Sequence, residues 1–156
     1  MDGIKLQVNV YKGLPVLLGK VKAVALASVL GKADTWIHMK MRHNVVKGKA
    51  LEFVQSDLDL LNAYMPLLGD EILHSLIVYN NDREEVIPQI RELAKLISMS
   101  YVCEDVMGKK KRWYDARMAR RSAEGKATSF KEEDIIAINM AAMNVANELK
   151  SIEFTL

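Results

Sequence analysis

Basic side chains gather in two segments of the chain, and the chemistry that such a distribution suits is the neutralisation of phosphates. Residues 32–49 contain five Lys or Arg and one acidic residue, and residues 109–126 contain eight and two. Residues 51–75 contain five acidic residues and no Lys or Arg. A helix that reads DNA needs cations for phosphates and a few side chains at its start for base edges. The charge distribution therefore favours binding to nucleic acid.

Each basic segment contains a predicted helix whose polar face carries candidate contacts. Arg117, Arg120 and Arg121 have the i, i+3, i+4 spacing that places side chains on one helix face. Asn44 suits adenine and Arg42 suits guanine, if a major groove receives them. The predicted DNA-binding residues are Lys32, Thr35, His38, Lys40, Arg42, His43, Asn44, Lys47, Lys49, Lys109, Lys110, Lys111, Arg112, Arg117, Arg120, Arg121 and Lys126.

An internal repeat relates the two basic segments. Shifted by 77 residues, 31–62 aligns without gaps to 108–139 with ten identities in 32 positions, where chance gives about two. The identical pairs are Gly31/Gly108, Lys32/Lys109, Trp36/Trp113, Met41/Met118, Gly48/Gly125, Lys49/Lys126, Ala50/Ala127, Phe53/Phe130, Asp57/Asp134 and Asn62/Asn139. We predict a tandem duplication with an N-terminal extension at 1–20, units at 21–78 and 98–156, and a helical connector at 79–97.

Apolar spacing predicts an all-α, mostly helical fold with three helices in each unit. The first unit is expected to have helices at 20–30, ending at Gly31; at 36–44, capped by Asp34 or Thr35; and from Ser56 or Asp57, with a kink or break near Pro66. The second is expected to have helices from Ser98 or Ser100 to Gly108, from 113 to 121, and from Ser129 or Lys131 to about 152. The connector is predicted to be helical over 83–97 and bent near Pro88, and residues 4–10 alternate as a short strand does.

Two helices joined by a tight turn with glycine describe a helix-turn-helix. The first unit resembles that motif at Leu26, Ala27, Leu30, Gly31 and Ile37. The resemblance implies that Ala27 lets the helices approach, that Gly31 makes the turn and that Ile37 packs inward.

The second unit departs from the motif. Glu104 stands where the first unit has Ala27, and Cys103 where it has Leu26. In both units a basic residue, Lys40 or Arg117, occupies a position that the motif gives to an apolar one. Met41 and Met118, the next residues, are expected to pack inward instead.

A second resemblance covers Leu96 to Ile152, where the sequence reads L-I-S-x-S-Y-V…G-K-x3-W…G-K-x3-F…D-x4-N. This pattern resembles a family of small uncharacterised proteins from gut-bacterial genomes and their prophages. Its members usually carry one such segment at the C-terminus, and here it occurs twice. Because the family has no established activity, the resemblance implies a fold and a genomic context, that of prophage or mobile-element regulation.

No arrangement of residues predicts an enzyme, a metal site or a cofactor. His38, His43 and His74 lack metal-ligand spacing, and Cys103 stands alone on an apolar helix. There is no Ser/His/Asp set, nucleotide-binding glycine loop or paired-carboxylate motif. The longest apolar stretches fall short of the roughly 18 residues of a membrane helix, and residues 1–13 do not read as a signal peptide. We therefore expect a cytoplasmic protein.

The leading prediction is a non-enzymatic protein that binds double-stranded DNA and regulates transcription. The alternative is a helical assembly or interaction protein, such as a phage-encoded component or inhibitor, whose basic face binds an acidic protein. In a third interpretation only the second unit binds DNA. The apolar stripe of the last helix packs either on the first unit or on another chain, which would make a homo-oligomer. Units related by a two-fold axis favour an inverted-repeat DNA site, and units related by translation a direct repeat.

Overall fold

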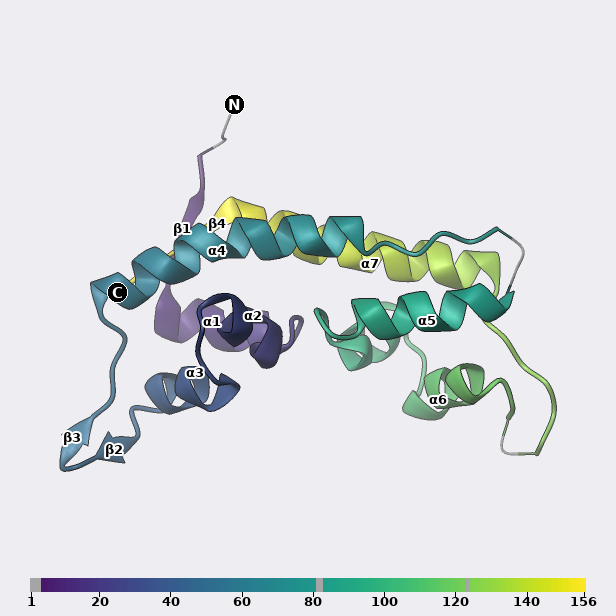
Figure 1. Cartoon of the computed structure of the whole chain (residues 1–156), viewed down its shortest axis with the longest axis horizontal. Helices are drawn as coiled ribbons and strands as arrows, with labels where there is room; N and C mark the ends of the chain where they lie inside the picture. Colours follow the sequence, from purple (N-terminus) through teal and green to yellow (C-terminus); the bar gives the residue numbers. More distant parts are fainter. Residues whose placement is uncertain (1–3, 81–82, 123) are drawn as a thin grey trace.

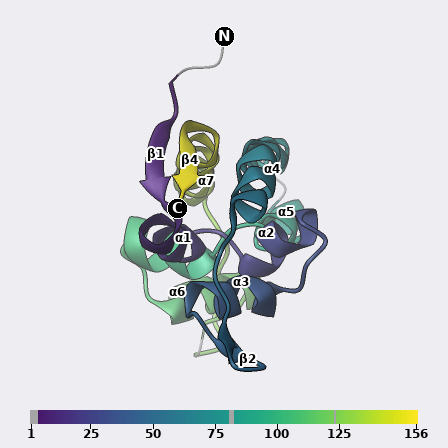
Figure 2. The same cartoon turned by 90° about the vertical axis from the view of Figure 1, so that its left-hand side faces the viewer.

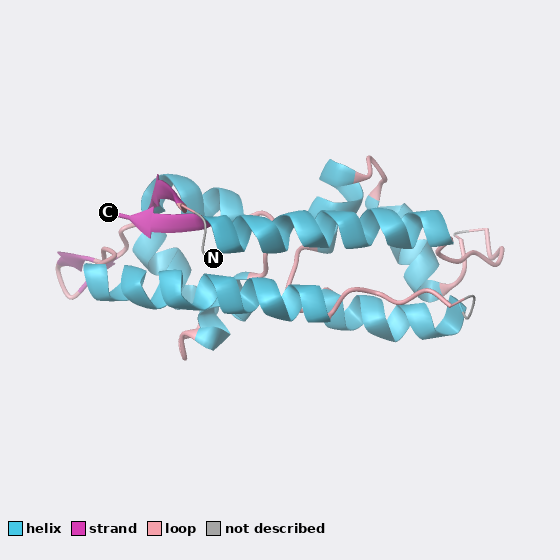
Figure 3. Cartoon of the chain, turned by 90° about the horizontal axis from the view of Figure 1, so that it is seen from above, coloured by secondary structure: helices cyan, strands magenta, loops and turns pink. Residues whose placement is uncertain are grey.

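Two long antiparallel helices form a platform along the length of the molecule, and the remaining helices lie beneath it (Figure 1). The computed structural model describes residues 4–80, 83–122 and 124–156. The platform helices are α4 (Gln55–His74) and α7 (Glu132–Ser151), which lie side by side when seen from above (Figure 3). Under one end lie α1 (Val10–Leu18), α2 (Ala23–Val29) and α3 (Asp34–Met41). Under the other lie α5 (Arg83–Leu93), the π-helix η1 (Tyr101–Val106) and α6 (Lys111–Ala119).

Short strands complete the fold. β1 (Leu6–Asn9) pairs in parallel with β4 (Ile152–Thr155), so the first strand lies beside the last (Figure 2). β2 (Val45–Val46) and β3 (Lys49–Ala50) form an antiparallel hairpin. The prediction of a mostly helical chain with a short N-terminal strand is confirmed.

The N-terminal extension predicted at residues 1–20 contains α1, a helix that the sequence analysis does not predict. Val10, Leu14 and Leu17 recur on one helical face and are almost fully buried. The Asn9 side chain begins this helix by accepting a hydrogen bond from the Tyr11 backbone N–H at 3.0 Å. Residues 10–18 therefore belong to the folded core.

The facing stripes of α4 and α7 make the centre of that core. All five residues of the stripe predicted on the last helix are buried: Ile135, Ile138, Ala142, Val145 and Leu149. The partner stripe on α4 is Leu58, Leu61, Met65, Leu68 and Ile72. Gly69 permits the close approach, since a Cβ there would lie 2.9 Å from the Ala146 carbonyl oxygen. Of the two places predicted for the stripe, the structure shows the one within the chain.

Several helix ends differ from the predicted ones. α4 continues through Pro66 without a break. Its first turn is capped from within, because the Asp57 carboxylate accepts a hydrogen bond from the Val54 N–H. α3 ends at Met41 and α6 at Ala119, earlier than predicted. Left-handed residues follow both helices, at His43 (φ 52°) and Arg120 (φ 63°).

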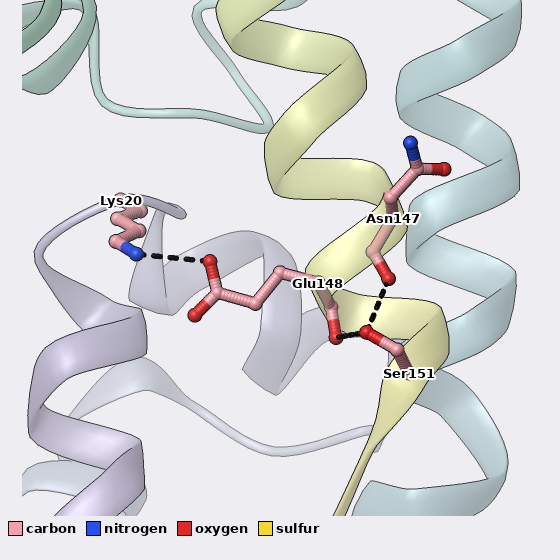
Figure 4. Close-up of polar contacts among 4 residues, drawn as sticks. All are labelled: Lys20, Asn147, Glu148 and Ser151. Atoms are coloured by element: carbon pink, nitrogen blue, oxygen red, sulfur yellow. Dashed lines mark hydrogen bonds and ion pairs between the residues drawn. The ribbon is translucent and has the colours of Figure 1, made fainter. Parts of the chain in front are cut away.

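Contacts between the two halves fix their relation. The Lys20 ammonium, between α1 and α2, donates to the Glu148 carboxylate of α7 at 2.9 Å (Figure 4). This hydrogen bond raises the pKa of Lys20. The Ser151 hydroxyl donates to the carbonyls of Asn147 and Glu148 and closes the last turn of α7. The α1–α2 loop is thus fastened to the end of the platform.

Two asparagines clasp the chain beyond the ends of the platform helices. Asn62 on α4 accepts from the Phe154 N–H (2.8 Å) and donates to its carbonyl (3.0 Å). Asn139 on α7 does the same to Ile77, with both distances 2.8 Å. Both clasped residues are buried. Each platform helix therefore holds the segment that follows the other.

Replacing Asn139 by alanine is expected to lower the free energy of unfolding by about 2–3 kcal/mol, because a buried N–H and a buried C=O lose their partners. Urea unfolding followed by circular dichroism measures the change. Asn144→Ala, an exposed asparagine of the same helix, is the matched control and should change stability by no more than about 0.5 kcal/mol. Equal effects of the two substitutions would contradict the clasp.

Candidate nucleic-acid interface

The basic segments lie on one side of the molecule, opposite the platform. α3 with the β2–β3 hairpin and α6 with the turn after it both project away from α4 and α7 (Figures 1 and 2). Many of the predicted contacts are exposed there: Lys32, Thr35, Arg42, Asn44, Lys47, Lys49, Lys109, Lys110, Lys111, Arg112, Arg120, Arg121 and Lys126. This face therefore presents two separate basic projections.

In the first half, α2 and α3 are joined by a tight turn. Gly31 takes the left-handed conformation with φ 69°, which glycine adopts without strain. The Lys32 N–H closes the turn by donating to the Ala27 carbonyl at 2.9 Å. Ala27 and Ile37 have no exposed surface, so the helices meet at a small residue. α3 is thereby held across α2 with its start facing outward.

In the second half, η1 replaces the first helix of the pair. Gly108 again turns the chain, with φ 68°. Here the Lys109 N–H donates to the Cys103 carbonyl at 2.7 Å, one residue further back than the equivalent bond in the first half. The wider π-helical turns bury Cys103 and leave Glu104 exposed. The π-helix thus keeps the charged Glu104 side chain out of the helix–helix contact, where it would be buried.

A tryptophan of each projecting helix packs on a phenylalanine. Trp36 meets Phe53 edge to face, with ring centroids 6.0 Å apart. Trp113 meets Phe130 in the same way at 5.7 Å. Both phenylalanines are buried. The tryptophans are therefore anchors of the core, as their place at the start of an amphipathic helix indicates.

Lys40 and Arg117 point inward and not to the outer face. Lys40 Nζ lies 5.1 Å from the Trp36 ring centroid and 2.7 Å from the Asp57 carboxylate. The Arg117 guanidinium lies 4.3 Å from the Trp113 centroid, and its Nε is 3.9 Å from the Asp134 carboxylate. That last distance is an ion pair and not a hydrogen bond, so the buried Nε has no hydrogen-bond acceptor. These two cations tie α3 and α6 to the platform.

The predicted arginine face on the second helix is wrong in its geometry. α6 ends at Ala119, so only Arg117 of the three arginines lies on it. Arg120 ends the helix in a left-handed conformation, and Arg121 forms an antiparallel bridge with Ala127. Arg120 and Arg121 are exposed, whereas Arg117 is not.

His43 and Asn44, two predicted contacts of the first unit, do not lie on its helix either. His43 and Asn44 follow α3, and the His43 ring stacks on Tyr11 with centroids 4.6 Å apart. Asn44 is exposed and leads into the hairpin. His38 is partly buried on α3. Of the predicted residues on this helix, Thr35 at its start is the one that is plainly exposed.

A hairpin tip carrying lysines lies beside each projecting helix. Lys47 and Gly48, with φ 52° and 78°, make the β2–β3 turn. In the second half the Ser122 N–H donates to the Lys126 carbonyl at 2.9 Å, and Gly125 has φ 76°. The lysines of both tips are exposed.

Between α6 and the second tip lies an open basin of about 770 Å³. Its walls carry more cations than acids. They are formed by Gly108, Lys109, Lys110, Arg112, Trp113, Asp115, Ala116, Arg117, Arg121, Ser122 and Glu124. A concave basic surface of this kind suits a run of phosphates.

Among the described residues, no three His, Cys, Asp or Glu side chains gather as metal ligands do. Burial raises the pKa of the Cys103 thiol to about 11 and that of Tyr114 to about 12. A thiol with so high a pKa is a poor nucleophile at neutral pH. In the described parts of the chain, no helix is both long and apolar enough to cross a bilayer.

Comparison with known proteins gives one family for part of the chain. Residues 86–156, which run from α5 to β4, match the family described as "Domain of unknown function (DUF5053)". No curated protein and no solved structure matches the chain. The match covers most of the second half, including η1, α6 and the basin.

Proposed function

We propose that this chain is a non-enzymatic protein that binds double-stranded DNA through two helix-turn-helix units produced by tandem duplication. The observation that carries the proposal is the pair of outward helices, α3 and α6, on one side of the platform, each entered through a left-handed glycine and flanked by exposed basic residues. An α-helix fits the major groove, and the lysines before it and on the adjacent tip would meet phosphates. The resemblance to prophage proteins supports a cytoplasmic regulator of mobile-element transcription.

Repeated contacts support the duplication. α4 and α7 begin 77 residues apart and have equal length. The Lys40–Asp57 and Arg117–Asp134 ion pairs join residues that are related by the same offset of 77 positions. The residues of the two asparagine clasps and of the two tryptophan–phenylalanine contacts are related by this offset too. Ancestry from one unit explains why buried polar partners recur with this offset.

A second candidate is a helical assembly protein. Ile136, Met140 and Met143 are exposed along one side of α7, at i, i+4 and i+7. Such a stripe would suit another helix, either of a second copy or of a partner protein. The basic face would then meet an acidic protein surface.

The decisive test is fluorescence anisotropy of the purified chain on labelled 30-base-pair duplexes of random sequence, across a salt series. We expect log K to fall linearly with log salt, with a slope of about −0.9 for each phosphate contact. No binding at low salt would contradict DNA binding and favour the assembly protein.

A further inference from the structure

We infer that the chain reads an inverted repeat made of two unequal half-sites, and that one chain spans both. This inference rests on the proposed function and concerns the layout of the DNA that the two units would share. Three features carry it: the direction in which the halves face, their separation and the difference between their outer surfaces.

The halves face each other about an approximate two-fold axis. Asn62 of α4 clasps Phe154, which follows α7, and Asn139 of α7 clasps Ile77, which follows α4. Reciprocal contacts of this form arise from a two-fold relation, whereas a translation would leave them one-sided. α3 and α6 precede the starts of α4 and α7, so the same axis relates them. A duplex presents equivalent groove edges to such a pair when its half-sites are inverted.

The platform is long enough to hold the two halves one turn of DNA apart. Asn62 lies level with Phe154, seven residues after the start of α4, and Asn139 lies likewise on α7. The two helices overlap between the levels of Asn62 and Asn139, and each helix start extends seven residues beyond this overlap. At a rise of 1.5 Å per residue, the overlap and the two extensions together place the starts of α4 and α7 about 40 Å apart. α3 and α6 lie inside those ends beneath the platform (Figure 1). Successive major grooves on one face of B-DNA are about 34–36 Å apart.

The platform holds this separation without a second chain. The α4 and α7 stripes are buried against each other, and Gly69 lets the α4 backbone pack closely against the Ala146 carbonyl. Lys20 adds its hydrogen bond to Glu148. Because close-packed helices resist sliding, the two units can engage only half-sites with the matching spacing.

The two units present different residues to the groove. α6 begins with Lys111 and Arg112, whereas α3 begins with Asp34 and Thr35. All four side chains are exposed. Arginine pairs with guanine, and a leading aspartate repels phosphate. The half-site under α6 should therefore be bound more tightly and should contain guanine, and the half-site under α3 should differ from it.

Selection of bound duplexes from a 30-base-pair random library, followed by sequencing, tests this layout. We expect two unlike motifs in inverted orientation, with centres 10–11 base pairs apart. Inserting five base pairs between the motifs should lower affinity at least tenfold, to that of the α6 half-site alone, because the second motif then lies on the opposite face.

Other results would overturn the inference in distinguishable ways. Enrichment of a direct repeat or of one isolated motif would contradict the two-fold layout and leave DNA binding intact. Unchanged affinity after the five-base-pair insertion would contradict a rigid spacing. Absence of binding to any duplex, in the selection and in the salt series, would reject the proposed function and this inference with it.

Discussion

Replacing Lys110, Arg112 and Arg121 together by alanine is expected to weaken binding to random duplex DNA by about 10²–10³-fold at 0.1 M salt. All three side chains are exposed and line the basin beside α6. Each lost phosphate contact removes about 0.9 from the slope of log K against log salt, and so about 0.9 log units of affinity at 0.1 M. The slope of the variant should thus be shallower by nearly three. Anisotropy across the same salt series measures both quantities.

A matched control separates this surface from net charge. Lys5, Lys12 and Lys131 lie outside both basic segments, and their replacement by alanine removes the same charge. This control should retain the salt slope of the unaltered chain. Equal losses in the two variants would show that affinity follows net charge alone, and an unchanged slope in the first would contradict a role for the basin. Arg117 is left in place because its contacts are with the core.

Sequence pattern was sufficient for the features that local residue chemistry decides. The two glycines predicted to end a helix, Gly31 and Gly108, have φ of 69° and 68°. The stripe from Ile135 to Leu149 was evident from its spacing and is buried. Such features depend on a single residue or on one helical period, so they need no knowledge of distant partners.

Features that depend on distant partners could not be predicted in the same way. β4 pairs with β1, which lies near the opposite end of the chain. The alternation of residues 4–10 predicts a strand that reaches Val10, so it hides the helical period of α1, in which Leu14 and Leu17 follow Val10. The π-helix keeps the Glu104 carboxylate out of the contact between η1 and α6. It could not be predicted, because that contact is known only from the packed structure.

The inward turn of Lys40 and Arg117 was also missed, although the sequence held a signal for it. Both stand where a helix-turn-helix has an apolar residue, and both recur with Asp57 and Asp134 at the same 77-residue offset. Both aspartates also cap their helices, since each accepts a hydrogen bond from the backbone N–H of the residue three positions before it. A basic residue at an apolar position, with an acid recurring alongside it, indicates a buried ion pair.

Asp134→Ala is expected to lower the free energy of unfolding by about 4 kcal/mol, the largest stability effect that the structure predicts. Its carboxylate lies 3.9 Å from Arg117 Nε and accepts the Lys131 N–H at 2.8 Å. The two side chains are only 12% and 18% exposed. Removing one member of a buried pair costs about 3–5 kcal/mol because the other charge stays unpaired, and loss of the cap adds about 1 kcal/mol. Urea unfolding measures the loss.

Two further variants distinguish the ion pair from the cap. Glu132→Ala removes an exposed acid from the same helical turn and should cost no more than about 0.5 kcal/mol. The double variant Arg117→Met, Asp134→Ala removes both charges without restoring the cap, so it should recover at least half of the loss. A double variant no more stable than Asp134→Ala would assign the effect to the cap. Recovery would show that Arg117 holds α6 beneath the platform, which explains why this arginine, unlike its exposed neighbours, is withheld from the basic face.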